Sequence, residues 1–92
     1  MSNLKTEKDV KELIENYDYE DVVIFSNPDY ASAFVGISDD NRAIYDYDEM
    51  IEFLVREDGM TGMEAVDFIE YNTIRALPYF GENAPIILYR LY

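Results

Sequence analysis

Near its C-terminal end the sequence contains a helix-start pattern, then a proline that ends the helix, then an apolar run. This combination limits the folds that the chain can adopt. Thr61 followed three residues later by Glu64 is a capping-box pattern, in which each side chain accepts a hydrogen bond from the other residue's backbone N–H. Apolar residues then recur at spacings of three and four, which predicts a helix over 62–76. Pro78 ends that helix, and the run over 85–90 predicts a buried strand. The core unit is therefore a helix followed by a strand.

The rest of the chain alternates between helical and strand-like patterns. Thr6 and Asp9 form a weaker capping pattern before an apolar stripe, and β-branched residues are frequent in the short runs that follow. These patterns predict two further helices and three further strands: helices over 7–17 and 48–58, and strands over 22–26, 31–38 and 42–46. The expected fold is α+β, with a small antiparallel or mixed four-stranded sheet and three helices packed on it in the order α-β-β-β-α-α-β. Residues 1–92 are expected to form a single acidic domain.

Acidic residues outnumber basic ones by a wide margin. The 92 residues include 20 Asp and Glu but only 7 Lys and Arg, which gives a formal net charge of -13. Because the hydrophobic fraction is 49%, the chain is too apolar for a disordered acidic tail and is expected to fold around a core. A field of this sign repels nucleic acids and membranes and attracts basic protein surfaces. The competing interpretation is that the acids only keep the domain dispersed in water.

The residue types limit the available chemistry. The sequence has no His and no Cys, which removes the commonest general base and nucleophile, imidazole–thiolate zinc sites and disulfides. Asp46, Asp48 and Glu52 place three carboxylates close together. Ile51, however, occupies the position at which a calcium loop needs glycine, and a helix cap explains the same carboxylates. We therefore expect no enzyme activity, no metal and no cofactor. The lack of a signal-peptide pattern and of a membrane-length apolar run predicts a cytoplasmic protein.

Sixteen of the acids lie between Glu15 and Glu70, where only Arg42 and Arg56 oppose them. Alternate residues on a strand are roughly 6–7 Å apart, and one DNA strand spaces its phosphates roughly 3.4 Å along the axis. Rows of carboxylates can therefore imitate a phosphate track, with tyrosine rings as flat apolar faces among them. The expected partner-binding surface takes its potential from eight acids and its contact area from two tyrosines: Asp39, Asp40, Asp46, Asp48, Glu49, Glu52, Glu57 and Asp58, with Tyr45 and Tyr47.

Several stretches of the sequence also carry a resemblance to a known group of proteins. They are Asp40-Asn-Arg-Ala-Ile-Tyr-Asp-Tyr-Asp-Glu-Met-Ile-Glu, Glu64-Ala, Tyr71-Asn-Thr-Ile-Arg-Ala-Leu-Pro-Tyr and Ala84-Pro-Ile-Ile. Over about the last two-thirds of its length the chain resembles small acidic, uncharacterised proteins of phages and mobile elements of Gram-positive bacteria. That resemblance implies an accessory product that acts on a protein of the host or the element, without a known enzyme activity. Small acidic phage products include anti-CRISPR proteins and other DNA mimics.

The segment from Tyr71 to Arg75 interrupts an apolar helix with polar residues. The structural interpretation, which we favour, is that Asn72 and Thr73 bond the local backbone while Arg75 pairs with a nearby carboxylate. The functional interpretation is a small recognition patch.

Together these patterns predict a noncatalytic acidic inhibitor or modulator that binds a basic, nucleic-acid-binding protein of the host or element as a DNA mimic. We expect neither direct nucleic-acid binding nor membrane binding, and a homodimer is left open. The alternative is a structural or oligomerisation module without a DNA-related target.

Moderate salt is expected to raise the melting temperature. Screening, with a Debye length of about 10 Å at 0.1 M, weakens repulsion among the acids between Glu15 and Glu70. Thermal unfolding followed by circular dichroism at increasing sodium chloride concentration measures the effect. A melting temperature indifferent to salt would show that the charges are well compensated in the fold.

Overall fold

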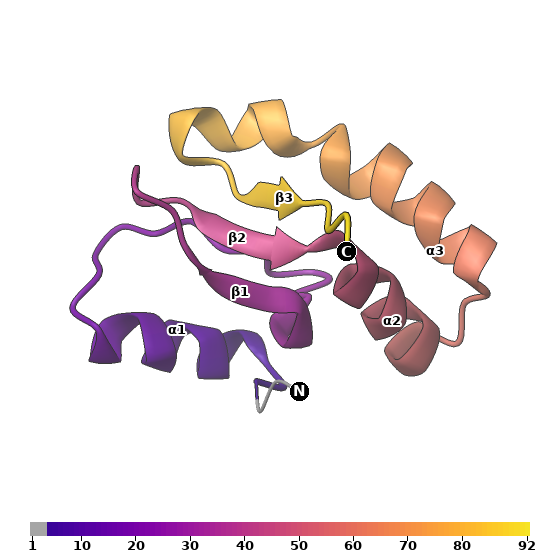
Figure 1. The fold of residues 1–92 in the computed structure, drawn as a ribbon, viewed down its shortest axis with the longest axis horizontal. Helices are drawn as coiled ribbons and strands as arrows, with labels where there is room; N and C mark the ends of the chain where they lie inside the picture. Colours follow the sequence, from indigo (N-terminus) through magenta and orange to yellow (C-terminus); the bar gives the residue numbers. More distant parts are fainter. Residues whose placement is uncertain (1–3) are drawn as a thin grey trace.

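Three short strands form a mixed sheet at the centre of the protein, with helices around it (Figure 1). The computed structural model describes residues 4–92. The helices and strands follow in the order α1 (Glu7–Asn16), β1 (Phe34–Ile37), β2 (Ala43–Asp46), α2 (Tyr47–Asp58), α3 (Gly62–Phe68) and β3 (Ile86–Leu88). Three short helical segments join them: the 3-10 turn η1 (Ala31–Ala33), the π-helical η2 (Ile69–Ile74) and the 3-10 segment η3 (Leu77–Asn83). The fold is α+β with the element order α-β-β-α-α-β.

The sheet has the strand order β1-β2-β3, so β2 is its central strand. β1 pairs with β2 antiparallel through a tight hairpin, with a bulge between Phe34 and Gly36. β2 pairs with β3 in parallel, and such a pair requires a long crossover connection, which α2 and α3 supply. The register places Tyr45 beside both Phe34 and Ile87. These three residues therefore share one face of the sheet.

Local side-chain caps set the helix starts, as the sequence predicts. Both capping boxes are complete: Thr6 with Asp9 begins α1, and Thr61 with Glu64 begins α3. The backbone N–H groups of Lys5 and Thr6 donate to the Asp9 carboxylate, and these bonds hold the pKa of Asp9 below its usual value. At the other end of α2, Gly59 has a φ of 68°, a conformation that glycine adopts without strain.

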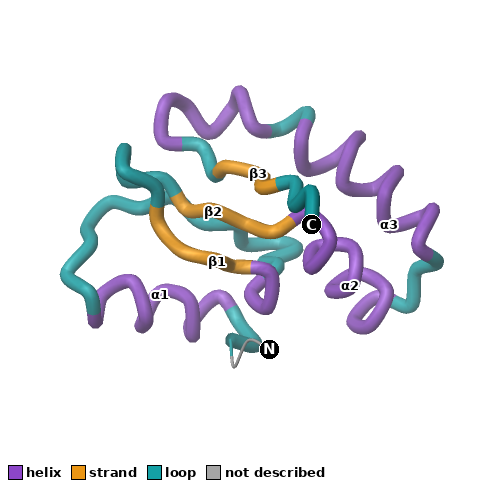
Figure 2. Tube along the Cα trace, in the orientation of Figure 1, coloured by secondary structure: helices purple, strands orange, loops and turns teal. Residues whose placement is uncertain are grey.

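The predicted strand over 22–26 is wrong, and the sheet in residues 4–92 has three strands, not four. The chain turns through left-handed backbone conformations at Asp18 and Asp21, with φ of 62° and 58°. It then crosses the sheet on the side away from the viewer in Figure 2, within the loop that joins α1 to β1. There the backbone N–H of Phe25 donates to the Tyr45 hydroxyl at 3.2 Å, instead of to a neighbouring strand. The apolar run thus covers the core without joining the sheet.

Other predicted boundaries differ by smaller amounts. The strand expected over 31–38 begins with the η1 turn and is extended only as β1, and the strand expected over 85–90 is shorter, as β3. The helix expected over 62–76 is α-helical only as far as Phe68 and continues as the π-helical η2. The remaining two helices and the strand over 42–46 are confirmed to within one residue at each end.

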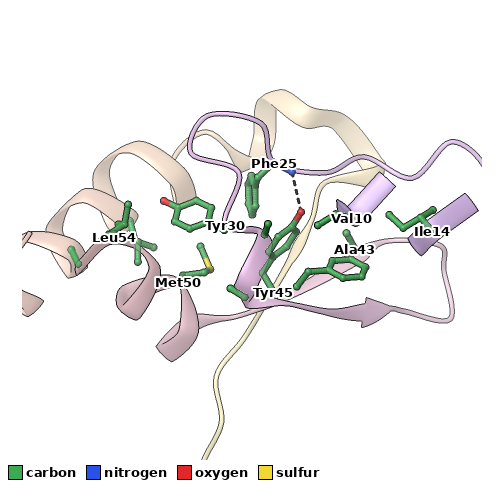
Figure 3. Close-up of a cluster of buried hydrophobic side chains, with 13 residues drawn as sticks. Val10, Ile14, Phe25, Tyr30, Ala43, Tyr45, Met50 and Leu54 are labelled. Atoms are coloured by element: carbon green, nitrogen blue, oxygen red, sulfur yellow. Dashed lines mark hydrogen bonds between the residues drawn. The ribbon is translucent and has the colours of Figure 1, made fainter. Parts of the chain in front are cut away.

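Aromatic rings fill the core between the sheet, the 17–30 loop and η2 (Figure 3). Phe25 packs on Tyr45 with ring centroids 4.7 Å apart, and Phe34 meets Tyr45 edge-on at 5.7 Å. Tyr30 is fully buried, and its hydroxyl lies 2.6 Å from the Thr73 hydroxyl of η2. Ring pairs of this kind are each worth about 0.5–1.5 kcal/mol beyond their burial. Tyr45 therefore lies at the centre of the aromatic core.

Removing the Tyr45 hydroxyl is expected to destabilise the protein. Tyr45→Phe keeps the ring but leaves the buried N–H of Phe25 without its acceptor, at a cost of about 1–3 kcal/mol. Urea denaturation of Tyr45→Phe and of the native chain measures the difference in unfolding free energy. The matched control is Tyr79→Phe, because Tyr79 is 92% exposed and should tolerate the change. Equal stability of the two variants would contradict a structural role for this hydrogen bond.

Candidate functional site

The residues of the predicted binding surface lie in three different places. Tyr45 is fully buried in the core, and Asp46 is only 2% exposed. The structure therefore corrects the expectation that the Tyr45 ring offers contact area and that Asp46 adds to the surface potential. The reason is the periodicity of β2: Tyr45 points to the core face, and Asp46 is the residue at which the strand turns into α2.

Asp46 acts as a structural residue. Its Oδ1 accepts the backbone N–H of Glu49 at 3.1 Å, which makes it the N-cap of α2. Its Oδ2 accepts a hydrogen bond from the guanidinium of Arg90, which follows β3. The two bonds compensate a carboxylate that is almost completely removed from water.

Asp39 and Asp40 lie in the turn between β1 and β2, at the end of the sheet away from α2 (Figure 1). The Ser38 hydroxyl donates to Asp40, and this bond, with the nearby Arg42 guanidinium, holds the pKa of Asp40 below its usual value. The Asn41 side chain donates to the carbonyl of Glu20 at 3.0 Å, which ties the turn to the 17–30 loop. These two acids therefore belong to a separate group from those on α2.

The remaining acids are exposed residues of one helix, α2. We define the α2 acidic surface as the five exposed carboxylates of that helix: Asp48, Glu49, Glu52, Glu57 and Asp58. Met50 and Leu54 of α2 are fully buried, and Asp48, Glu49 and Glu52 lie on the opposite side of the helix, while Glu57 and Asp58 are exposed at its C-terminal end. Within residues 4–92, the only ion pair that any of these five acids forms is that of Glu57 with Arg56, at 3.1 Å between two half-exposed side chains. Most of the negative potential of α2 is thus uncompensated.

Beside this surface, Tyr47 forms an aromatic pair that the sequence analysis missed. The ring of Tyr47 packs against the ring of Tyr89, with centroids 4.9 Å apart and an interplanar angle of 38°. Burial raises the pKa of Tyr47, and the charges of Glu70 and Asp48 raise it further. The pKa of Tyr89 is raised by burial and by Glu70. No sequence spacing signals this cluster, because its members come from α2, η2 and the end of β3.

The segment from Tyr71 to Arg75 differs from the favoured interpretation in two respects, at Arg75 and at Thr73. Asn72 does bond the local backbone, by donating to the Phe68 carbonyl at 3.2 Å. Arg75, however, lies over the ring of Tyr71, with its guanidinium carbon 4.5 Å from the ring centroid, and it forms no ion pair with a carboxylate within residues 4–92. Thr73 bonds the hydroxyl of Tyr30 and so faces the core. Most of this segment belongs to the π-helical η2, which the Thr73–Tyr30 hydrogen bond attaches to the core.

Within residues 4–92, no three carboxylates gather in a group that could hold a metal ion. Every buried polar side-chain atom in that range has a hydrogen-bond partner. No helix within it is long and apolar enough to cross a membrane.

Comparisons with known proteins do not add an identity. No family model matches the chain, and neither the curated proteins nor the solved structures include a significant match.

Removing the Asp46 side chain is expected to weaken the start of α2. Asp46→Ala loses the cap, which is worth about 0.5–2 kcal/mol, and also the partner of Arg90. Asp46→Asn keeps an oxygen that can cap the helix, so it should lose markedly less stability. Urea denaturation of both variants measures the two losses. If Asp46→Asn is as unstable as Asp46→Ala, the charge and not the cap is what α2 requires.

Proposed function

We propose that the protein is a noncatalytic, acidic modulator that binds a basic surface on a nucleic-acid-binding protein. The observation that carries this proposal is the α2 acidic surface, which presents five exposed carboxylates on one helix with a single ion pair among residues 4–92. A surface of this kind costs stability through self-repulsion. A basic partner would relieve that repulsion on binding.

The spacing of the acids suits a partner that grips a phosphate backbone. Side chains three and four residues apart on a helix are neighbours, roughly 5–6 Å from each other at Cβ. Glu49 and Glu52 have this spacing, and so do Asp48 and Glu52. Lysine and arginine side chains that reach separate phosphates on DNA can reach carboxylates at such intervals. The α2 acidic surface is therefore proposed to replace the nucleic acid on the partner.

The Tyr47–Tyr89 pair provides apolar contact area at the edge of this surface. The Tyr89 side chain is 53% exposed, while Tyr47 is partly buried beneath it. Tyrosine hydroxyls are neutral at physiological pH, and the raised pKa values of Tyr47 and Tyr89 are in keeping with this, so the pair adds no charge of its own. Aromatic rings of this kind commonly anchor protein interfaces, and Arg side chains stack on them.

A second candidate function is an oligomerisation module, and exposed apolar residues near the C-terminus support it. Ile44 and Ile86 are paired across β2 and β3 on the face opposite Tyr45, and both are only partly buried. Leu88 is 37% exposed and Leu91 is 90% exposed. In this alternative the function would depend on these apolar side chains and not on the acids.

Charge reversal on α2 separates the two functions. Glu49→Lys with Glu52→Lys should abolish capture of basic nucleic-acid-binding proteins from a lysate, and added duplex DNA should displace the partners of the native chain. Binding by the native chain should weaken steeply with salt, mainly through a slower association rate, as expected for electrostatic steering. Glu49 lies in the first turn of α2, so its reversal costs about 0.3–1 kcal/mol, and folding is checked by circular dichroism.

The matched control is Glu15→Lys with Glu82→Lys, which changes the net charge equally at exposed positions outside α2. Retained binding by this control and lost binding by the α2 variant would support the proposal. Unchanged partner binding by the folded α2 variant would rule out the α2 acidic surface and leave the oligomerisation module.

A further inference from the structure

The outer edge of β1 is available for strand pairing. β1 lies at the edge of the sheet, and within residues 4–92 its only strand neighbour is β2. Its sequence, Phe34-Val-Gly-Ile, contains neither a charge nor a proline. Charged residues and proline usually protect an exposed edge from further pairing. Here the bulge after Phe34 and the neighbouring helix α1 are the features that limit such pairing. The backbone of β1 can therefore accept another extended chain.

A groove runs between this edge and α1, which lies alongside β1 in Figure 1. It has a volume of about 290 Å³. Its walls are apolar or aromatic on both sides: Leu13, Ile14 and Tyr17 of α1, Tyr19 of the following loop, and Phe34, Val35, Gly36 and Ile37 of β1. Tyr17 is 72% exposed and Val35 is 47% exposed. The groove therefore opens to solvent while offering apolar contacts along its length.

Gly36 keeps the strand side of the groove open. A Cβ atom built at Gly36 would meet no other heavy atom within 4 Å among residues 4–92, and Gly36 is not one of the residues with positive φ. A larger residue could thus be accommodated by the fold. The glycine allows a second backbone to approach β1 closely.

One end of the groove is acidic. Tyr19 and Ile37 line the groove; Glu20 directly follows Tyr19 in the chain, and Asp39 lies two residues after Ile37. The hydrogen bond from the Asn41 side chain to the Glu20 carbonyl holds these two segments together. Glu20 and Asp39 are both exposed, and no ion pair of either is found in residues 4–92.

The basic residues of α1 lie away from the groove. Lys11 pairs with Glu7 at 3.2 Å, and Glu7 in turn accepts from Ser26 in the 17–30 loop. On the helix, Lys8 and Lys11 are both turned by more than a quarter of a turn from Leu13 and Tyr17, which line the groove. The groove consequently favours an occupant with positive charge at the Ile37 end.

We propose that β1 takes up an extended, basic segment of a partner protein as a fourth strand of the sheet. The backbone of that segment would pair with β1, its alternate apolar side chains would enter the groove, and its Lys or Arg residues would meet Glu20 and Asp39. This surface uses none of the residues of the α2 acidic surface. The proposal therefore goes beyond the function assigned to α2 and stands or falls separately from it.

A second copy of the chain is a poorer occupant than a basic peptide. Each copy carries a net charge of -13, so two copies repel each other, whereas a cationic peptide is attracted to the same surface. The acidic end of the groove favours an occupant with positive charge, and the β1 strand of a second copy contains no basic residue.

The test uses a fluorescein-labelled peptide, Lys-Lys-Val-Thr-Val-Thr-Val-Lys-Lys, whose symmetric charge allows it to bind in either direction. Its affinity for the full chain is measured by fluorescence anisotropy. We expect saturable binding that weakens with salt. The same peptide methylated at alternate amide nitrogens keeps its charge and side chains but loses the donors on one edge, and it should bind at least about tenfold more weakly, a difference of about 1.4 kcal/mol.

Two pairs of protein variants locate the site. Gly36→Leu adds a bulky side chain to the edge strand and should weaken binding, while Gly36→Ala should bind nearly as well as the native chain. Glu20→Lys with Asp39→Lys should weaken binding about tenfold, whereas Glu49→Lys with Glu52→Lys, an equal change in net charge, should weaken it much less. Circular dichroism confirms that each variant is folded.

Three outcomes would overturn the proposal. The methylated peptide could bind as tightly as the parent, which would mean that no strand is added to the sheet. This result would contradict the proposal even if Gly36→Leu failed to fold. The two charge-reversal variants could lose binding equally, which would mean that the peptide responds only to net charge. Sedimentation could show that the chain dimerises and that Gly36→Leu abolishes the dimer, which would mean that a second copy occupies the edge.

Discussion

The arrangement of the protein depends on the side chain of Tyr45, which crosses the core from the central strand to the loop behind the sheet. Its ring packs against Phe25 and Phe34, and its hydroxyl accepts the Phe25 N–H. That bond satisfies a buried backbone donor which would otherwise need a strand partner. The loop can therefore cover the core without joining the sheet, and the outer edge of β1 is left without a strand among residues 4–92.

A small domain with a net charge of -13 must keep its acids out of the core. Within residues 4–92 one carboxylate is buried, that of Asp46, and it is hydrogen-bonded both to the start of α2 and to Arg90. The other polar group with this burial is the Thr73 hydroxyl, which bonds to Tyr30. The remaining acids lie on helix faces and turns, where water screens them. The negative field is thus a property of the surface, and the core beneath it is almost entirely neutral.

The acids are divided between the two ends of the sheet, and this division supports two kinds of recognition. The α2 acidic surface offers only side chains, so it suits a partner with dispersed basic side chains, such as a surface that grips a phosphate backbone. The edge of β1 offers main-chain hydrogen bonds and an apolar groove, with acids at one end. It suits an extended segment instead.

The sequence by itself determined the features that depend on hydrogen bonds within one helical turn. The capping boxes at Thr6 and Thr61 and the glycine after α2 set the helix ends, because each such bond spans only a few residues. The acidity of α2 followed from the order of residues in the sequence. Only the tertiary structure decided that the 22–26 run stays outside the sheet, that Tyr45 and Asp46 are buried, and that Tyr89 packs beside Tyr47. Each of these depends on groups about 20 or more residues apart, whose meeting is set by how the helices and strands pack and not by any local pattern.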